Sequence, residues 1–141
     1  MKNQPVQIIH HTADIGLRAF GRDLPEAFCQ AARGMFSLIT DLRKVRATEK
    51  IEIDIAAEDS AGLLVAWLNE LLFYFDTRQW LVKKCDIREI NDNRLKASIW
   101  GEKVDASRHR LKRGIKSATY HMLNIEFEAN KGYSVSVILD I

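Results

Sequence analysis

Cysteine, proline and long apolar runs are scarce in this chain of 141 residues. Its only cysteines, Cys29 and Cys85, are too few for a disulfide scaffold or a zinc cluster, so a reducing cytoplasm is the simplest compartment. No apolar run approaches the ~20 residues that a membrane-spanning helix needs, and residues 1–7 lack the apolar core of a secretory signal. We therefore expect a cytoplasmic protein that has no membrane partner.

An excess of one charge sign is also lacking. The net charge of +2 at pH 7 is too small to indicate nucleic-acid binding by itself. The sequence contains no G-x-S-x-G nucleophile motif, no phosphate-binding P-loop and no glycine fingerprint for dinucleotides. Nothing in it therefore supports catalysis by these enzyme classes. With 47% apolar residues, the chain is long enough for one domain, which we expect to span residues 1–141.

The order of the predicted elements indicates an α+β fold. Alternating apolar residues predict strands near residues 15–20, 51–55, 95–99 and 133–139, and a change of parity between residues 82 and 90 suggests a β-bulge. Apolar residues at helical spacing predict two helices, one capped by Asp23 and one that begins near Asp59. We expect a two-layer sandwich with both main helices on one face of a mixed or antiparallel sheet. Periodicity alone leaves residues 119–123 as strand or helix.

Two aspartates near opposite ends of the chain are the best candidates for a functional site. Asp14 precedes a predicted strand and Asp140 ends the last one, and the ends of compact domains often lie close together. Strand parity places both carboxylates on the face that the helices do not cover. With the α-carboxylate of Ile141 they would form an all-oxygen cluster suited to a hard cation such as Ca²⁺. The alternative is that Asp14 begins a turn and Asp140 is a solvated acid.

The histidines suggest a second hypothesis, a metal-dependent hydrolase that uses His10, His11 and Asp14 as ligands. Adjacent strand residues point to opposite faces, so His10 and His11 could share an ion only outside a regular strand. The sequence has no H-E-x-x-H motif or comparable spacing to support this hypothesis. His121 shares the parity of nearby apolar residues and is expected in the core, whereas His109 is expected in a polar loop.

Residues 108–116 form a basic segment that could contact phosphates or an acidic partner. The segment lacks the interleaved aromatic residues of a single-strand binder, so a solvated loop is the plainer interpretation. Lys116 is its most interesting member, because it is predicted to leave the loop and to lie on the polar face of a strand.

Several short motifs, taken together, resemble those of the archease family. In chain order they are His11-Thr12-Ala13-Asp14, residues 26–28 and 34–36 of the first helix, residues 67–73 of the second, Lys116 with Thr119-Tyr120-His121-Met122, and the closing Ile138-Leu139-Asp140-Ile141. Each motif is weak alone, but their order and spacing are specific. The resemblance covers the chain from about residue 10 to residue 141.

This resemblance implies a non-catalytic protein cofactor. Archeases assist the RtcB-type RNA ligase, which joins ends carrying a 2′,3′-cyclic or 3′-phosphate to a 5′-hydroxyl in tRNA splicing and RNA repair. They promote guanylylation of the ligase and its multiple turnover. The implied metal ligands are Asp14, Asp140 and Ile141, with Ca²⁺ as the expected ion and Mn²⁺ or Mg²⁺ as alternatives. Lys116 and His11 are implied candidates for activation, and tRNA or other RNA would be met only through the ligase.

The chain also departs from the family pattern. His10 stands where family members commonly have Asp, which removes an acid from beside the expected site and leaves the preferred ion open. Gly114 and Ile115 replace the usual Glu and Val, and Ser117 replaces the usual Ala, so the contacts of the basic segment are open as well. A passive RNA-binding or chaperone-like module is the remaining alternative to a ligase activator.

Overall fold

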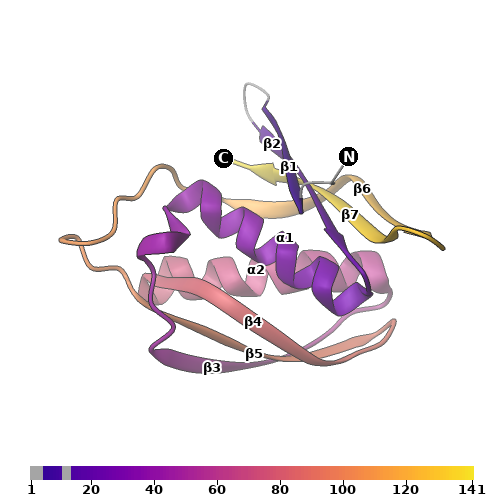
Figure 1. Ribbon diagram of the computed structural model, residues 1–141, viewed down its shortest axis with the longest axis horizontal. Coiled ribbons are helices and arrows are strands. Elements are labelled where there is room, and N and C mark those ends of the chain that lie inside the picture. Colours follow the sequence, from indigo (N-terminus) through magenta and orange to yellow (C-terminus); the bar gives the residue numbers. More distant parts are fainter. Residues whose placement is uncertain (1–4, 11–13) are drawn as a thin grey trace.

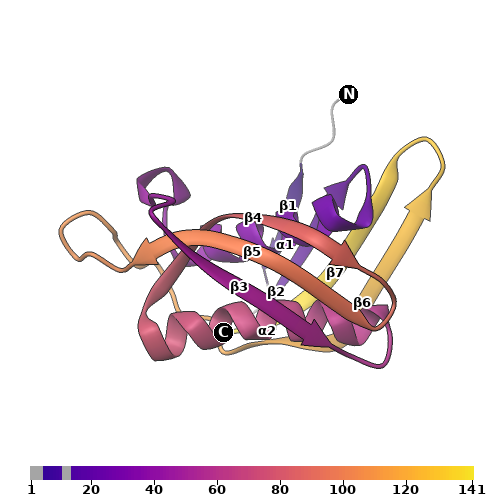
Figure 2. The same ribbon diagram turned by 90° about the horizontal axis from the view of Figure 1, so that it is seen from below.

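The fold consists of two antiparallel sheets with two helices between them, as Figures 1 and 2 show from two directions. The computed structural model describes residues 5–10 and 14–141. The first sheet, in spatial order, contains β1 (Val6–His10), β2 (Asp14–Gly21), β7 (Gly132–Asp140) and β6 (Ser117–Glu128). The second contains β3 (Glu49–Ala56), β5 (Arg94–Lys103) and β4 (Trp80–Ile90). The helices are α1 (Leu24–Ile39) and α2 (Ser60–Arg78), and a short 3₁₀ helix, η1 (Leu42–Lys44), follows α1.

The expected α+β class and antiparallel pairing are confirmed, and the structure adds that the strands divide into two sheets instead of one. The reason lies in the helices, which contact both sheets: α1 packs on β2 and β4, and α2 packs on β6 and β4. The buried residues of α2 cover more than half of its circumference, namely Leu63, Leu64, Val65, Trp67, Leu68, Leu71 and Leu72. A helix with so wide an apolar face can bury it only between two layers.

Both helices begin where their capping residues predict. The Asp23 side chain accepts a hydrogen bond from the Glu26 amide at 2.9 Å, and the Asp59 side chain accepts one from the Gly62 amide at 2.7 Å. Near the other end of α1, the chain has Gly34, where a Cβ atom would lie only 2.9 Å from the Leu17 side chain and 3.0 Å from Val6. Glycine therefore allows α1 to approach β1 and β2 closely.

The predicted bulge in β4 is confirmed, because its pairing with β5 shifts at Val82/Lys84 and again at Ile87/Glu89. The segment 119–123 belongs to β6, but its pairing with β7 is interrupted between Thr119 and Asn124. Met122 adopts a φ of 53° within this interruption, which is rare for a residue other than glycine. The side-chain alternation on one half of β6 therefore does not continue into the other half.

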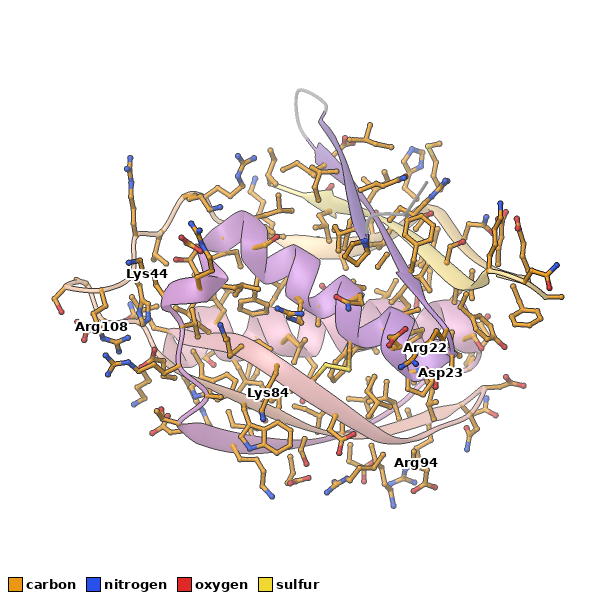
Figure 3. All side chains as sticks on the ribbon, viewed as in Figure 1. Arg22, Asp23, Lys44, Lys84, Arg94 and Arg108 are labelled. Carbon is orange, nitrogen blue, oxygen red and sulfur yellow. A yellow bond between two sulfur atoms is a disulfide. The ribbon has the colours of Figure 1, made fainter. Side chains whose placement is uncertain are left out.

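Cys29 of α1 and Cys85 of β4 form one disulfide, visible in Figure 3, a bond that the interpretation of the two cysteines as those of a reducing cytoplasm did not include. Their Cα atoms are 5.9 Å apart, and 56 residues separate them along the chain. The bond joins the helical layer to the second sheet. Within the part of the chain that the structure describes, no helix is long and apolar enough to cross a membrane.

Candidate metal site

The strand that follows Asp14 and the last strand of the chain are neighbours in the middle of the first sheet. Asp14 opens β2, Asp140 ends β7, and the two are direct cross-strand partners. Directly opposed residues have Cβ atoms about 4.5–5.5 Å apart and side chains on the same face. The predicted proximity of the two carboxylates is thus confirmed by the register. We call Asp14, Asp140 and the adjoining Ile141 the acidic tip.

The acidic tip faces away from the helices. Ile15 and Leu17, which alternate with Asp14, are buried in the core on the helix-covered face of β2. On β7, Val137 and Leu139 alternate with Asp140 and are buried in the same core. Strand alternation therefore directs both carboxylates to the uncovered face, as the sequence predicts.

Strand β6 borders the acidic tip on its other side. Ser117 is the cross-strand partner of Asp140, and the Lys116 amide donates a 2.8 Å hydrogen bond to the Asp140 carbonyl. The prediction that Lys116 lies on a strand is wrong, because it is exposed and directly precedes β6. The main chain of Lys116 is nevertheless fixed at the acidic tip. Its exposed side chain therefore starts from a backbone position next to Asp140.

One oxygen of the acidic tip lacks the partner that burial normally demands. Asp14 Oδ1 is inaccessible to solvent and has no hydrogen-bond donor among the described residues. Neither Asp14 nor Asp140 forms an ion pair with any residue that the structure describes. Buried polar atoms are nearly always satisfied, and an unexplained one calls for a missing partner. A hard divalent cation, which prefers carboxylate oxygen, fits this pair.

The acidic tip alone would leave an ion partly open. Across residues 5–10 and 14–141, no three side chains of His, Cys, Asp or Glu gather in a group that could hold a metal. Two carboxylates supply fewer oxygens than the six to eight that Ca²⁺ takes, so further oxygens would come from water or a partner. His11 lies outside the described residues, and of His10 the structure describes only the main chain, which ends β1 opposite Ile15. The predicted ligand set of a hydrolase, His10, His11 and Asp14, therefore lies largely outside the described residues.

The expectation for His121 is wrong, whereas that for His109 is confirmed, because His109 lies in the loop between β5 and β6. His121 is exposed, because the interruption of β6 around Met122 breaks the alternation that would have turned it inward. His109 is only 5% exposed. Its Nδ1 accepts a hydrogen bond from the Asp105 amide at 2.8 Å, so Nε2 carries the proton and lies 3.0 Å from Glu102 Oε2.

Glu102, which the sequence analysis did not single out, is the centre of this second polar cluster. Its side chain is 11% exposed, and its Oε1 accepts a 2.6 Å hydrogen bond from the Arg108 guanidinium. The Arg46 amide donates to its other oxygen at 2.7 Å. The guanidinium of Arg108 and, secondarily, the Arg46 amide lower the pKa of Glu102 from 4.5 to about 2. The cluster anchors the segment between β5 and β6, and it is a structural centre and not part of the acidic tip.

The opposed carboxylates lead to a prediction about Asp140→Asn. In a metal chelator, the substitution is expected to raise the free energy of unfolding by roughly 0.2–1 kcal/mol, because it removes a like charge directly opposite Asp14. At a Ca²⁺ concentration about 100-fold above the dissociation constant, the free energy of unfolding of the wild-type protein should rise by about 2.7 kcal/mol and that of the variant by much less. The variant is then the less stable of the two proteins, whereas in the chelator it is the more stable. Thermal unfolding in both buffers measures this reversal.

A matched control for this reversal is Asp76→Asn, because Asp76 is exposed on α2 and has no ion-pair partner among the described residues. The control should respond to Ca²⁺ as the wild type does. A wild-type protein that gains no stability from Ca²⁺, Mn²⁺ or Mg²⁺ would contradict the metal site.

Comparison with known proteins gives the family of the chain. Residues 7–141 match the model of the Archease protein family (MTH1598/TM1083). The chain is 38% identical over 139 residues to a protein archease of Sulfurisphaera tokodaii, covering 98% of this chain and 99% of that one. It is 40% identical over 136 residues to a protein archease of Saccharolobus islandicus, covering 96% and 97% of the two chains.

A solved structure supports the same conclusion. The solution structure of Methanobacterium thermoautotrophicum protein 1598 is similar to this fold with a TM-score of 0.78 and 34% sequence identity. The similarity covers 97% of this chain and 99% of that one. Sequence and fold agree over nearly the whole length, and the chain therefore belongs to the archease family.

Proposed function

We propose that this archease is a non-catalytic activator of an RtcB-type RNA ligase and acts in the cytoplasm in tRNA splicing and RNA repair. The family resemblance suggests the partner, and the acidic tip supplies the site. The observation that carries the proposal is the direct pairing of Asp14 with Asp140, together with the unpartnered Oδ1 of Asp14. In this function the protein promotes guanylylation of the ligase and its repeated turnover.

In this proposal Asp14 and Asp140 hold a divalent ion, with Ile141 beside them. Ca²⁺ is the first candidate, and Mn²⁺ and Mg²⁺ are the alternatives. When bound, the ion supplies a positive charge that offsets the repulsion of the carboxylates and attracts oxygen atoms of the partner. The two paired strands fix the spacing of the carboxylates. Because two carboxylates do not complete the coordination of the ion, positions remain for oxygens of water or of the partner.

Lys116 is the proposed second contact with the ligase. Its main chain is bonded to Asp140, so its side chain leaves the surface next to the acidic tip. A cation at that place can pair with an acidic group of the ligase or with a phosphate without any rearrangement of β6. His11 belongs to the same proposed contact, on the strength of its motif alone.

The test is ligase turnover with Asp14→Asn and Asp140→Asn proteins. Wild-type protein should stimulate guanylylation and multiple turnover of an added RtcB-type ligase. Each variant should reduce that stimulation by about tenfold or more, equivalent to roughly 1.4 kcal/mol of lost interaction. Asp76→Asn, the same chemical change on α2, should keep it. Lys116→Gln should weaken stimulation while Ca²⁺ binding, measured by calorimetry, is unchanged.

The same assay separates this proposal from the other functions. Full stimulation by a folded Asp14→Asn/Asp140→Asn double variant would overturn the role of the acidic tip. Metal-dependent hydrolysis of a phosphoester by the protein without any ligase would favour the hydrolase instead. Circular dichroism on each variant establishes that the protein used is folded.

A further inference from the structure

A basic groove lies at the opposite end of α1 from its N-cap. It has a volume of about 670 Å³ and is lined by the end of α1, by η1 and by the segment between β5 and β6. Its cations are Arg33, Arg43, Lys44, Arg108, Arg110 and Lys112. Figure 3 shows Lys44 and Arg108 together at this end of the molecule. We call these six residues and the hollow between them the basic groove.

Most of this positive charge is not neutralised. Asp41 is the single acid that lines the groove, and it pairs with Arg43 at 2.9 Å. Arg108 pairs with Glu102 behind the groove. Among the residues that the structure describes, no carboxylate lies within ion-pair distance of the other four cations, which are Arg33, Lys44, Arg110 and Lys112. A small net charge for the whole chain thus conceals a strongly positive site.

The backbone of Arg110 and Lys112, and not their charged side chains, holds these two residues in place within the basic segment. The Lys112 amide donates to the Ile39 carbonyl at 2.7 Å, and Thr40 Oγ1 donates to the Arg110 carbonyl at 2.8 Å. The buried His109, which directly precedes Arg110, has its Nε2 3.1 Å from the Lys44 carbonyl oxygen. Arg110 and Lys112 are therefore held in place while their own charges remain available. Groups that are already positioned lose less entropy when they bind a ligand.

We propose that the basic groove binds the phosphate backbone of a single-stranded RNA. Guanidinium groups match phosphate oxygens in pairs, and several cations lining one groove suit a chain of phosphates better than one isolated anion. The groove lacks the aromatic residues on which most single-strand binders stack bases, so its contact with RNA depends on charge alone. The basic groove therefore recognises the charge of the RNA and not the identity of its bases, and its affinity is independent of the RNA sequence.

The position of the basic groove relates RNA binding to the acidic tip. The segment between β5 and β6 runs from one sheet to the other past the end of α1, as Figure 1 shows, and continues to Lys116 at the acidic tip. Lys112 and Lys116 are four residues apart, at most about 14 Å of extended chain. An RNA strand in the groove could therefore extend as far as the acidic tip. This inference deepens the proposed function, because RNA is then held by the activator as well as by the ligase.

The test is fluorescence anisotropy of a labelled oligouridylate of about 12 nucleotides, within the usual site size of such grooves, without ligase. The wild-type protein should bind it, and four cations on phosphates predict that the logarithm of affinity falls with the logarithm of salt concentration with a slope near −3. Arg110→Gln/Lys112→Gln should weaken binding about tenfold and make the slope less steep by about 1.4. These substitutions leave the main-chain hydrogen bonds of residues 110 and 112 in place.

The control removes the same two charges elsewhere, as Lys96→Gln/Lys131→Gln. These lysines form loose exposed pairs with Glu89 at 3.9 Å and Glu128 at 3.6 Å, outside the groove. The control should bind as the wild type does. Equal weakening by both double variants, or tighter binding of inorganic triphosphate or polyglutamate than of the oligouridylate, would overturn the proposal. Because no ligase is present, RNA binding can fail while activation persists, and the reverse.

Discussion

Trp67→Ala is expected to lower the free energy of unfolding by about 4 kcal/mol, among the largest effects of a single substitution in this protein. Trp67 is fully buried on α2, and its Nε1 donates a 3.0 Å hydrogen bond to the Phe28 carbonyl of α1. The side chain thus fills the core and joins the two helices. Removing it leaves a large cavity where both sheets and both helices meet.

Urea denaturation measures this loss, and Trp67→Phe is the matched variant. Phenylalanine keeps most of the volume but cannot donate to Phe28, so its cost should be about 1–2 kcal/mol. The difference between the two variants separates packing from hydrogen bonding. A loss below about 1 kcal/mol for Trp67→Ala would show that the core can close around the missing ring.

The effect should extend to the acidic tip. Two residues after Trp67 on α2, Asn69 donates to the Ala118 carbonyl at 3.1 Å and accepts from the Ala118 amide at 2.7 Å. Its carboxamide therefore pairs with the edge of β6 as another strand would. A shift of α2 would move β6 beside Asp140, so Trp67→Ala should also weaken the Ca²⁺ binding that we propose for the acidic tip.

Glu102→Gln should cost about 3 kcal/mol at pH 7, because it removes one partner of a nearly buried ion pair with Arg108 and weakens the contact with His109. The carboxylate has a pKa of about 2 in the folded protein against an ordinary value of 4.5. A lowered pKa means that the folded state favours the ionised form. The stabilisation is then complete above about pH 5 and is lost as the pH falls from 4.5 toward 2.

The difference in unfolding free energy between wild type and Glu102→Gln should therefore shrink as the pH falls and nearly vanish near pH 2. Denaturant titrations at several pH values measure it. Glu49→Gln is a suitable control, because Glu49 is exposed on β3 and accepts only a single side-chain hydrogen bond, from Trp80 at 3.2 Å. A difference that stays constant between pH 7 and pH 2 would contradict the role given to Glu102.

The parts of the fold that are governed by local patterns could be predicted from the sequence. Asp23 and Asp59 mark helix starts because a short acceptor side chain satisfies free amides wherever the chain enters a helix. Alternation along residues 133–139 gives the buried face of β7 for an equally local reason. The shared face of Asp14 and Asp140 follows from the same alternation once the terminal strands are taken as neighbours, whereas their direct pairing is known only from the structure.

What the sequence could not supply depends on contacts between distant segments. The change of parity at Met122 depends on a positive φ, which the sequence does not indicate because the residue is not glycine. As a result His121 is exposed and not in the core as expected. His109 lies in a stretch without periodicity, and its burial accompanies contacts with Glu102 and Lys44, which are distant from one another in the sequence. The division of the strands into two sheets likewise arises from α1 and α2 having apolar residues on more than one face.

The bridge between Cys29 and Cys85 has a topological consequence. It converts the stretch of chain between these residues into a covalent ring that includes the end of α1, η1, β3 and the whole of α2. A peptide bond cut anywhere inside that ring would leave the two pieces attached to each other. The basic groove takes η1 from within this ring and residues 108–112 from outside it, so even a nicked molecule would keep both of its walls on one covalent unit.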